Sequence, residues 1–573
     1  MTTTRLPDSP AAFRDAPLEE IESHYRELAE RPLDDVEQWL ADWSRLEELL
    51  QETLMIAVID YDCDTKDPEK ERVSLRLTSE IAPELEKWSV RLGDRLVECG
   101  YTRPDLETAL ARFRNRTELF REENVALTAE LERLGSEHRK VIGALSVEWE
   151  GSELTPPQLR PFASSGDRAV RERAFRAFFG CYIAAHNELA DIYDRMLRAR
   201  GQMARNAGFE NYRDYGHRLH NRFDYTPDDC LRLHDAVEEH VTPAIDRIYR
   251  RRAEVMQLGT TEVRPWDAID SHVASPDPLG RPAIMPFKTQ HELVTVAQRV
   301  FERVDPNFGE EFASLIENEV LDLMSRPGKG PGAFCAMLPV RRLPFLFENA
   351  SGISGDVDTL LHESGHAFHA FATMNNLPLI FQWEYGSEIA EVASMGMELL
   401  GRPYLRASEG GFYSEEDYRR IQIDHLEEIL VSLGHMASVD AFQQWVYTQT
   451  EIPDVSARDG YWISLRQRFE RGVDWSGCEA ERIARWYEQP HFFLYPLYYI
   501  EYALAQLGAL QVWRNAKRNQ AEAVAAYRRA LALGGTRPLP ELYAAAGAEL
   551  VFDSAKLAPL VQFVEEELDR LRD

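Results

Sequence analysis

Long stretches of amphipathic helical sequence are the feature that most constrains this chain. From about Ala11 to Leu145, Leu, Ala, Glu and Arg recur at three- and four-residue spacing, as in LEELLQETLMIAVI. That spacing is typical of α-helices with one apolar face. The same texture resumes at RERAFRAFFGCYIAAHNELADIYDRMLRARGQMARNAG and continues beyond Thr226, which is expected to cap a helix. The chain is therefore predicted to be mainly α.

Two short regions break this texture and predict small β structures. The segment from Ser146 to Leu159 alternates apolar and polar residues before Gly151 and a Pro-Pro pair, which indicates a hairpin. Further on, Gly and Pro surround two β-like runs, at 333–338 and 343–348. The GKG of that region lacks the spacing of a phosphate loop. A small hairpin or sheet is expected there, without a nucleotide site.

Length and composition bound the organisation of the chain. Its 573 residues suffice for several domain-sized units, and we predict an N-terminal helical domain over 1–190 and a catalytic domain over 191–573. No internal repeat or low-complexity tail interrupts them. The oligomeric state does not follow from the sequence.

Charge, cysteines and hydropathy indicate the environment. A formal net charge of −32 disfavours binding to nucleic acid or to anionic membranes. The six cysteines stand singly, without a CxxC pair, and are expected to be free, buried thiols. The N-terminus lacks the pattern of a secretory signal, and no apolar run is long enough to span a membrane. We expect a cytoplasmic protein.

A metal-binding motif follows the second β-like region. In DVDTLLHESGHAFHAF, His362, Glu363 and His366 form HExxH on a helix whose apolar residues mark a buried side. Residues four apart differ by about 40° around a helix, so the two imidazoles can bind one zinc ion with Glu363 beside it. The bare motif also arises by chance, so its context must support it.

The next helical segment offers a third ligand. WEYGSEIAEVASMGMELL contains four candidate carboxylates, on Glu384, Glu388, Glu391 and Glu398. Small residues surround Glu391, and such a face permits another helix to approach closely. Glu391 is therefore the preferred ligand, ahead of Glu388.

A histidine and several tyrosines crowd one segment near the C-terminus. WYEQPHFFLYPLYYIEYALAQLGALQVW contains His491, Tyr495, Tyr498, Tyr499 and Tyr502. These side chains can donate hydrogen bonds to an oxyanion, although an aromatic core helix is the simpler interpretation of such a cluster taken alone.

These motifs together resemble one family. HESGHAFH, the preceding FENASGISGDVDTL, the later EIAEVASMGMEL and HFFLYPLYYIEYA look like the thimet oligopeptidase and oligoendopeptidase F family of zinc metallopeptidases, in the same order. The resemblance covers most of the chain from about Ser146. It implies a large helical body whose two halves enclose a deep channel for short, unfolded peptides.

The resemblance also assigns roles to residues. The family's zinc-binding glutamate follows the second histidine by about 25 positions, which selects Glu391. The histidine and tyrosines that bind substrate and stabilise the transition state correspond to His491 and to Tyr498 and Tyr499. Tyr495 and Tyr502 stay open as alternatives, because the spacing is ambiguous by one residue.

The expected reaction is hydrolysis of internal peptide bonds by zinc-activated water. Glu363 would accept the proton of the water and deliver it to the leaving amine. Asp358, one turn before His362, is a candidate partner for that imidazole, with a solvent-facing acid as the alternative. His369 is expected to pack or to lie at the surface rather than bind metal. An extended peptide could pair with the edge of the run at 332–338.

Three other functions stay open. An exopeptidase, either a carboxypeptidase or a dipeptidyl carboxypeptidase, would use the same zinc chemistry. A zinc hydrolase could act on other carbonyl compounds. A non-catalytic peptide-binding protein is disfavoured, because all three ligands and the general base are present. The sequence does not reveal cleavage preference, or whether another metal replaces zinc.

Overall fold

The computed structural model describes residues 6–259, 263–270 and 273–573. They group into two compact units, each built from three parts of the chain. The first unit takes residues from 1–118, 284–418 and 508–550, and the second takes 119–283, 419–507 and 551–573. Each unit combines segments that are far apart in the sequence, whereas the predicted domains 1–190 and 191–573 are continuous stretches. The two divisions are therefore not equivalent, and the predicted domains stay a prediction.

Helices dominate the first unit, and the apolar faces of its N-terminal helices meet around α3. Trp39, Trp43 and Leu46 of α3 are fully buried there. Asp35 caps the start of α3 by accepting a hydrogen bond from the backbone N–H of Gln38. The helices of this unit are α1 (Ala11–Arg14), α2 (Leu18–Glu30), α3 (Val36–Cys63), α4 (Pro68–Leu75), α5 (Ala82–Glu98), α6 (Glu107–Leu119), α13 (Gln290–Val304), α14 (Pro306–Glu317), α15 (Ser354–Asn376), α16 (Ser387–Gly401), α22 (Gln520–Leu531) and α23 (Leu539–Ala545).

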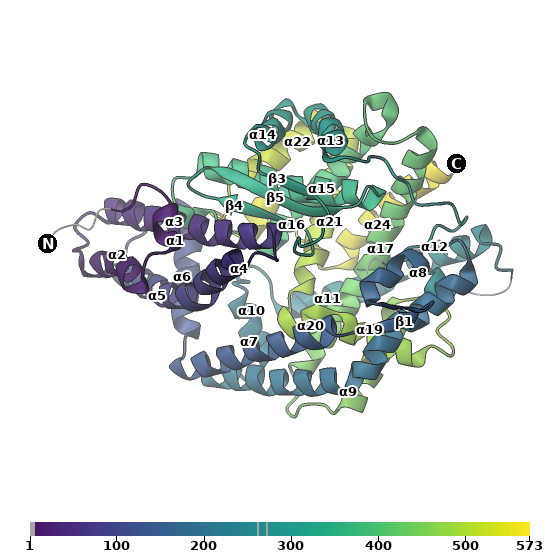
Figure 1. The fold of residues 1–573 in the computed structure, drawn as a ribbon, viewed down its shortest axis with the longest axis horizontal. Coiled ribbons are helices and arrows are strands. Elements are labelled where there is room, and N and C mark those ends of the chain that lie inside the picture. The colour runs from purple at the N-terminus through teal and green to yellow at the C-terminus, as the bar shows by residue number, and fades with distance from the viewer. Residues whose placement is uncertain (1–5, 260–262, 271–272) are drawn as a thin grey trace. The chain divides into compact units, whose positions relative to one another are not determined.

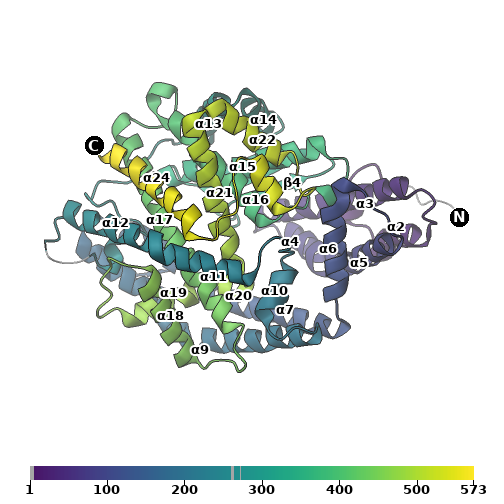
Figure 2. The ribbon, with the colours of Figure 1, turned by 180° about the vertical axis from the view of Figure 1, so that it is seen from behind.

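A three-stranded sheet lies within this helical unit. Its order is β3 (Leu321–Met324), β5 (Leu343–Ala350) and β4 (Phe334–Leu338), with β4 antiparallel and β3 parallel to β5. Helix α15 packs against β4 and β5, and α3 packs against β4 (Figure 1). Seen from behind, α22 lies beside α15 and α16 (Figure 2). The predicted hairpin is confirmed, whereas β3 was not predicted.

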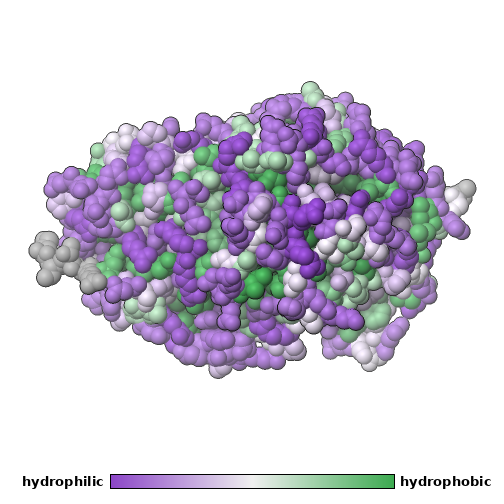
Figure 3. Space-filling model, turned by 90° about the horizontal axis from the view of Figure 1, so that it is seen from above, coloured by the Kyte–Doolittle hydropathy of each residue, from purple (hydrophilic) through white to green (hydrophobic). Residues whose placement is uncertain are grey.

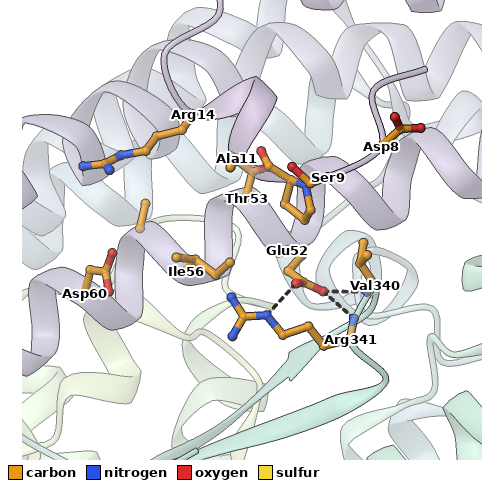
Figure 4. A pocket seen from close by; sticks show the side chains of 12 residues that line it. Asp8, Ser9, Ala11, Arg14, Glu52, Thr53, Ile56, Asp60, Val340 and Arg341 are labelled. Atoms are coloured by element: carbon orange, nitrogen blue, oxygen red, sulfur yellow. Dashed lines mark hydrogen bonds and ion pairs between the residues drawn. The ribbon is translucent and has the colours of Figure 1, made fainter. Parts of the chain in front are cut away.

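The turn of this hairpin is held by a buried carboxylate. Glu52 of α3 is 1% exposed and accepts hydrogen bonds from the backbone N–H groups of Val340 and Arg341, at 2.5 and 3.0 Å. The Arg341 guanidinium also pairs with Glu52, at 3.1 Å. These groups line one side of a cavity of about 390 Å³ between the turn, α3 and the first residues of the chain described (Figure 4). The position of β4 therefore depends on α3.

The second unit is helical apart from one hairpin. Strands β1 (Val147–Trp149) and β2 (Ser152–Leu154) are antiparallel, and the turn residues Glu150 and Gly151 both have positive φ, which suits a tight two-residue hairpin turn. Thr226 caps α11 as predicted. The helices are α7 (Glu122–Gly143), α8 (Arg160–Ala163), α9 (Arg168–Asn206), α10 (Tyr212–Leu219), α11 (Pro227–Ala236), α12 (Thr242–Val255), α18 (Val455–Phe469), α19 (Glu479–Glu488), α20 (Pro490–Leu494) and α24 (Ser554–Arg572).

Two further helices have residues in both units, namely α17 (Glu415–Val446) and α21 (Tyr499–Arg518). Short π-helical or 3₁₀ segments complete the assignment: Arg76–Ile81, Pro104–Leu106, Pro156–Leu159, Val237–Val241, Pro265–Asp267, Ile380–Gln382, Arg402–Leu405 and Ala407–Glu409. The prediction of a mainly α fold with a small sheet beside the HExxH helix is confirmed.

The surface and the state of the cysteines agree in most respects with the expectations from the sequence. Hydrophilic side chains predominate on the face shown in Figure 3, with apolar ones in smaller patches. None of the described helices is long and apolar enough to cross a membrane. All six cysteines are free, but burial was predicted too broadly, since Cys99 is exposed and Cys63 and Cys335 are half-buried.

Candidate metal centre and active-site residues

Helix α15 carries the HExxH motif from a well-defined start. The carboxylate of Asp356 accepts hydrogen bonds from the backbone N–H groups of Ser351, Gly352 and Ile353, at 2.7 to 3.0 Å. It thereby holds the loop that precedes α15 and pairs the backbone N–H of the N-cap residue Ile353, as in a capping box. The glycine-rich sequence before the motif therefore sets where α15 begins.

A glycine inside the motif lets α16 approach α15. A Cβ atom on Gly365 would lie 2.4 Å from the carbonyl oxygen of Ala393 and 2.6 Å from the Cα of Ser394. Both distances are well below van der Waals contact. The small residues around Glu391 thus support the close helix packing that the sequence predicted, and this packing brings a carboxylate of α16 to the two histidines of α15.

His362, His366 and Glu391 converge on one point. Their ligand atoms all lie within 4.8 Å of one another, and this is the group that the described residues offer to a metal. The Oε2 atom of Glu391 is 3.4 Å from Nε2 of His362 and 3.7 Å from Nε2 of His366. Tetrahedral ligands at about 2.0–2.1 Å from zinc are about 3.3 Å apart, so the donor types and spacing fit zinc.

Two side chains of α16 orient these candidate ligands. Glu398 Oε1 lies 2.7 Å from Nδ1 of His362, which leaves Nε2 of that ring facing Glu391. The hydroxyl of Ser394 donates to Oε2 of Glu391 at 2.8 Å. The hypothesis that Asp358 supports His362 is wrong in this structure, since Asp358 accepts instead from Arg402 at 2.8 Å and Glu398 contacts the imidazole.

Charges at the centre shift its pKa values in opposite directions. Burial raises the pKa of Glu391, but hydrogen bonding to His362 and the charges of both imidazoles outweigh it, and the pKa is about 2. Burial lowers the pKa of His366 to about 4. For His362, burial is outweighed by Glu391 and Glu398, and its pKa lies well above the usual value. Glu391 is therefore ionised and His366 neutral, as a metal requires, whereas His362 would have to release its proton when a metal binds.

Glu363 lies in a different environment. It is 7% exposed, and burial, with the charges of Glu391 and Glu398, raises its pKa to about 7 although His362 opposes this. Glu348 of β5, which interacts electrostatically with Glu363, is 2% exposed, and among the described residues neither of its carboxylate oxygens has a hydrogen-bond partner. Burial raises the pKa of Glu348 to about 9. Glu363 therefore has a carboxyl neighbour whose raised pKa favours the neutral form at physiological pH.

The remaining candidates of this region lie outside the ligand group. Glu388 is buried on α16 but does not converge with the histidines. Glu384 is largely exposed and pairs with Arg112 at 3.5 Å. His369 is fully buried and stacks on Tyr385, with ring centroids 3.8 Å apart, so of the two expected roles, packing or surface, the structure gives packing.

The second unit gathers the predicted histidine and tyrosines. The His491 ring centroid lies 4.7 to 6.2 Å from those of Tyr495, Tyr498, Tyr499 and Tyr502. Exposure distinguishes these tyrosines. Tyr499 is 5% exposed and Tyr495 is 56% exposed, while Tyr498 and Tyr502 are half-buried. A half-buried phenol combines a fixed position with access, so Tyr498 and Tyr502 are better placed to meet a ligand.

The turn between α20 and α21 is tightly held. Leu497 is buried with φ of 65°, a strained value for a residue with a Cβ. Its backbone N–H donates to Gln443 at 2.9 Å, and its carbonyl accepts from Arg222 at 2.6 Å. Arg222 also pairs with Glu501, and His220 contacts the carbonyl of Pro496 at 2.9 Å. These contacts impose one conformation on the turn that follows His491.

Sequence reasoning missed the residues that support the site. Glu398 was considered only as a ligand, and Ser394 only as a small residue. The sequence did contain a signal for Glu398, because it lies two helical turns after Glu391 and so on the same face of α16. Glu348 and Gln443 gave no such signal, since Glu348 lies on a strand outside the motif and Gln443 is 54 residues from Leu497.

Comparison with known proteins supports the motif analysis. The model of Peptidase family M3 matches residues 162–560. The oligoendopeptidase F homolog of Borreliella burgdorferi is 24% identical over 450 residues, covering 75% of this chain and 71% of the relative. Oligopeptidase PepF of Bacillus subtilis is 23% identical, covering 74% of this chain and 60% of the relative.

Solved structures agree on the fold. PZ peptidase A, solved with an inhibitor, has a TM-score of 0.85 at 26% identity and covers 97% of this chain and 98% of its own. Oligoendopeptidase F from Enterococcus faecium has a TM-score of 0.63 at 16% identity, with 98% and 99% covered, and supports the fold alone. The family match spans the HExxH helix, α16 and the His491 segment, and the chain therefore belongs to Peptidase family M3 and is a peptidase.

Proposed function

We propose that this peptidase is a zinc metallo-endopeptidase that hydrolyses internal bonds of short, unstructured peptides. The observation that carries the proposal is the convergence of His362, His366 and Glu391 beside a buried Glu363. The names of the relatives support oligopeptides as the substrate class. The predicted cytoplasmic location stays a prediction, as does a substrate channel.

The residues of the centre suit a defined division of work. Zinc bound by His362, His366 and Glu391 would supply a Lewis acid that polarises water and the scissile carbonyl. Glu363, kept off the ligand set, would take a proton from water and return it to the leaving amine. A pKa near 7 suits a group that must both accept and release a proton at neutral pH.

The sheet offers a way to align the substrate backbone. β4 lies at one edge of the three-stranded sheet, and in the described residues it pairs with β5 alone. An extended peptide could pair with the other edge of β4 through main-chain hydrogen bonds, which would make binding tolerant of side chains. Glu52 holds the turn after β4 and so supports that edge.

We further propose that His491 and Tyr498 donate hydrogen bonds to the oxyanion, and that Tyr499, being buried, supports this segment from behind. Each such donor contributes about 3–4 kcal/mol to transition-state stabilisation. The family resemblance and the exposure of the side chains support this assignment. Tyr502 is the alternative donor, because it is half-buried beside His491.

The test is cleavage of an internally quenched peptide blocked at both ends, by wild type, Glu363→Gln and the control Glu384→Gln, with zinc measured in each preparation. We expect internal cleavage by wild type and by the control, and a loss of about 10²–10⁴-fold for Glu363→Gln with zinc retained. If only peptides with free ends are trimmed, the protein is an exopeptidase. If no peptide is cut by zinc-loaded wild type, the proposed function is wrong.

A further inference from the structure

Four polar side chains of the second unit lie in a row that ends at His491. Arg466 comes from α18, His435 from α17, Gln489 precedes α20, and His491 lies on α20. Arg466 is 4% exposed and Gln489 is fully buried. Buried polar groups are retained where they are paired, so the order of donors and acceptors along this row is informative.

The row begins with a group that can only donate. Nη1 of Arg466 lies 3.2 Å from Nδ1 of His435, and a guanidinium has no acceptor atom. Nδ1 of His435 must therefore accept, which leaves the proton of that ring on Nε2. Glu470 accepts from the other end of Arg466 and from Arg482, so the guanidinium is anchored on both sides.

The same donor-to-acceptor order continues through the side-chain amide of Gln489. Nε2 of His435 donates to Oε1 of Gln489 at 3.4 Å, and Nε2 of Gln489 donates to Nδ1 of His491 at 2.6 Å. The second N–H of the same amide group is available to Tyr499, whose phenol also hydrogen-bonds with Gln489. Because Nδ1 of His491 accepts, its ring carries the proton on Nε2.

We propose that Arg466, His435 and Gln489 are positioning residues that set the tautomer of His491, so that its Nε2–H is always the hydrogen-bond donor. The inference rests on the proposed function, in which His491 donates to the oxyanion. It also explains why the His491 ring keeps its proton on Nε2. Arg466 has no acceptor atom, so the donor-to-acceptor order from Arg466 to His491 cannot reverse. Packing of His435 against Tyr499, at 5.7 Å between centroids, would keep the row in line.

The proposal makes a direct spectroscopic prediction. In the full-length, zinc-loaded protein labelled with ¹⁵N-histidine, we expect the His491 signals, assigned by their loss in His491→Gln, to show the Nε2–H tautomer. Gln489→Glu places an acceptor against Nδ1, and we expect the proton to move onto Nδ1. Arg466→Lys keeps a side chain that can only donate and should retain the wild-type tautomer of His491. In Arg466→Met, which has no such donor, the Nε2–H tautomer should no longer be the only one observed.

Kinetics complete the test. For Gln489→Glu and Arg466→Met we expect kcat to fall about 10- to 100-fold with KM little changed and zinc content unaltered, because a misdirected donor acts on the transition state. Gln444→Met is the matched control, since Gln444 is also buried in this unit and its side chain contacts Asp440 instead. It should change neither tautomer nor kcat.

The outcomes separate the two proposals. An Nδ1–H tautomer of His491 in the wild type would overturn the inference, as would an unchanged tautomer in Gln489→Glu. A changed tautomer with unchanged kcat would also overturn it as a positioning role. If zinc-loaded wild type cuts no peptide, the proposed function fails and the catalytic role given to the row fails with it, while the spectrum still decides the direction of the hydrogen bonds.

Discussion

The metal centre and the histidine–tyrosine turn are assembled in different ways. At the centre, His362 and His366 are one helical turn apart, and Glu391 follows on the next α-helix. Helical periodicity and the contact at Gly365 account for much of the geometry. At the turn, Leu497 is held by Arg222, which lies 275 residues away in the sequence. The first arrangement can be read from a short segment, and the second depends on tertiary contacts.

The largest effect we expect in this comparison falls on the turn. Tyr498→Phe should lower kcat about 10²–10³-fold if its phenol is an oxyanion donor. Tyr499→Phe should have a smaller effect, because this phenol is buried and hydrogen-bonds with Gln489. Steady-state kinetics at equal zinc content measure both. A larger loss for Tyr499→Phe would reverse the assignment of the two tyrosines.

A substitution that disturbs only the packing of α16 on α15 should weaken the metal centre. Gly365→Ala places a Cβ against the backbone of α16 and should destabilise the protein by about 1–3 kcal/mol and weaken zinc binding. Gly355→Ala, on the same helix, has its nearest contact at 4.0 Å and should be close to neutral. Thermal melts and zinc titration test the pair. Equal behaviour of the two variants would show that close helix packing does not govern the site.

Replacing a residue that hydrogen-bonds to a metal ligand should reduce zinc affinity less than replacing the ligand itself. Glu398→Gln should weaken zinc affinity or activity about 10- to 100-fold, because the amide orients His362 less strongly than a carboxylate. Asp358→Asn is the control, since Asp358 contacts Arg402 rather than a ligand. Competition with a chelator measures affinity. If Asp358→Asn has the greater effect, the sequence-based hypothesis would be restored.

The smallest effect concerns stability against pH. The folded-state pKa of Glu348 is raised by burial to about 9, so the native state holds a proton that the unfolded chain releases above about pH 4.5. Stability contributed by this group is therefore lost as pH rises from about 4.5 towards 9. Glu348→Gln should raise Tm by about 1–4 °C at pH 8 and less at pH 5.

Asp322 lies on the neighbouring strand β3, and its contribution to stability should change with pH in the opposite direction to that of Glu348. Burial raises the pKa of Asp322, but hydrogen bonds from Arg326, Cys63 and Lys329 outweigh it, and the pKa is about 2. This group stabilises the fold above the unfolded pKa of about 3.9, and the contribution is lost as pH falls towards 2. Asp322→Asn should lower Tm at pH 8. The same sign for both variants would contradict the burial argument.

These differences explain what the sequence could predict. The HExxH helix, the preference for Glu391 and the hairpin at β4 and β5 all follow from local period or composition. β3 has only four residues and pairs with β5 in parallel, so nothing local marks it. Glu398 was assigned a different role because its contact with His362 depends on how two helices cross. The row ending at His491 joins three separate segments and left no local pattern.

Glu391, together with the two histidines, is proposed to bind the metal. The most direct measurement is zinc content per chain, at a fixed low concentration of free zinc, in wild type, Glu391→Gln and Glu388→Gln. The two glutamates share one helix and are both buried, but Glu391 alone of them converges with the histidines. We predict one zinc per chain for wild type and Glu388→Gln, and little for Glu391→Gln. Zinc retained by Glu391→Gln and lost by Glu388→Gln would show that Glu388, and not Glu391, is the third ligand.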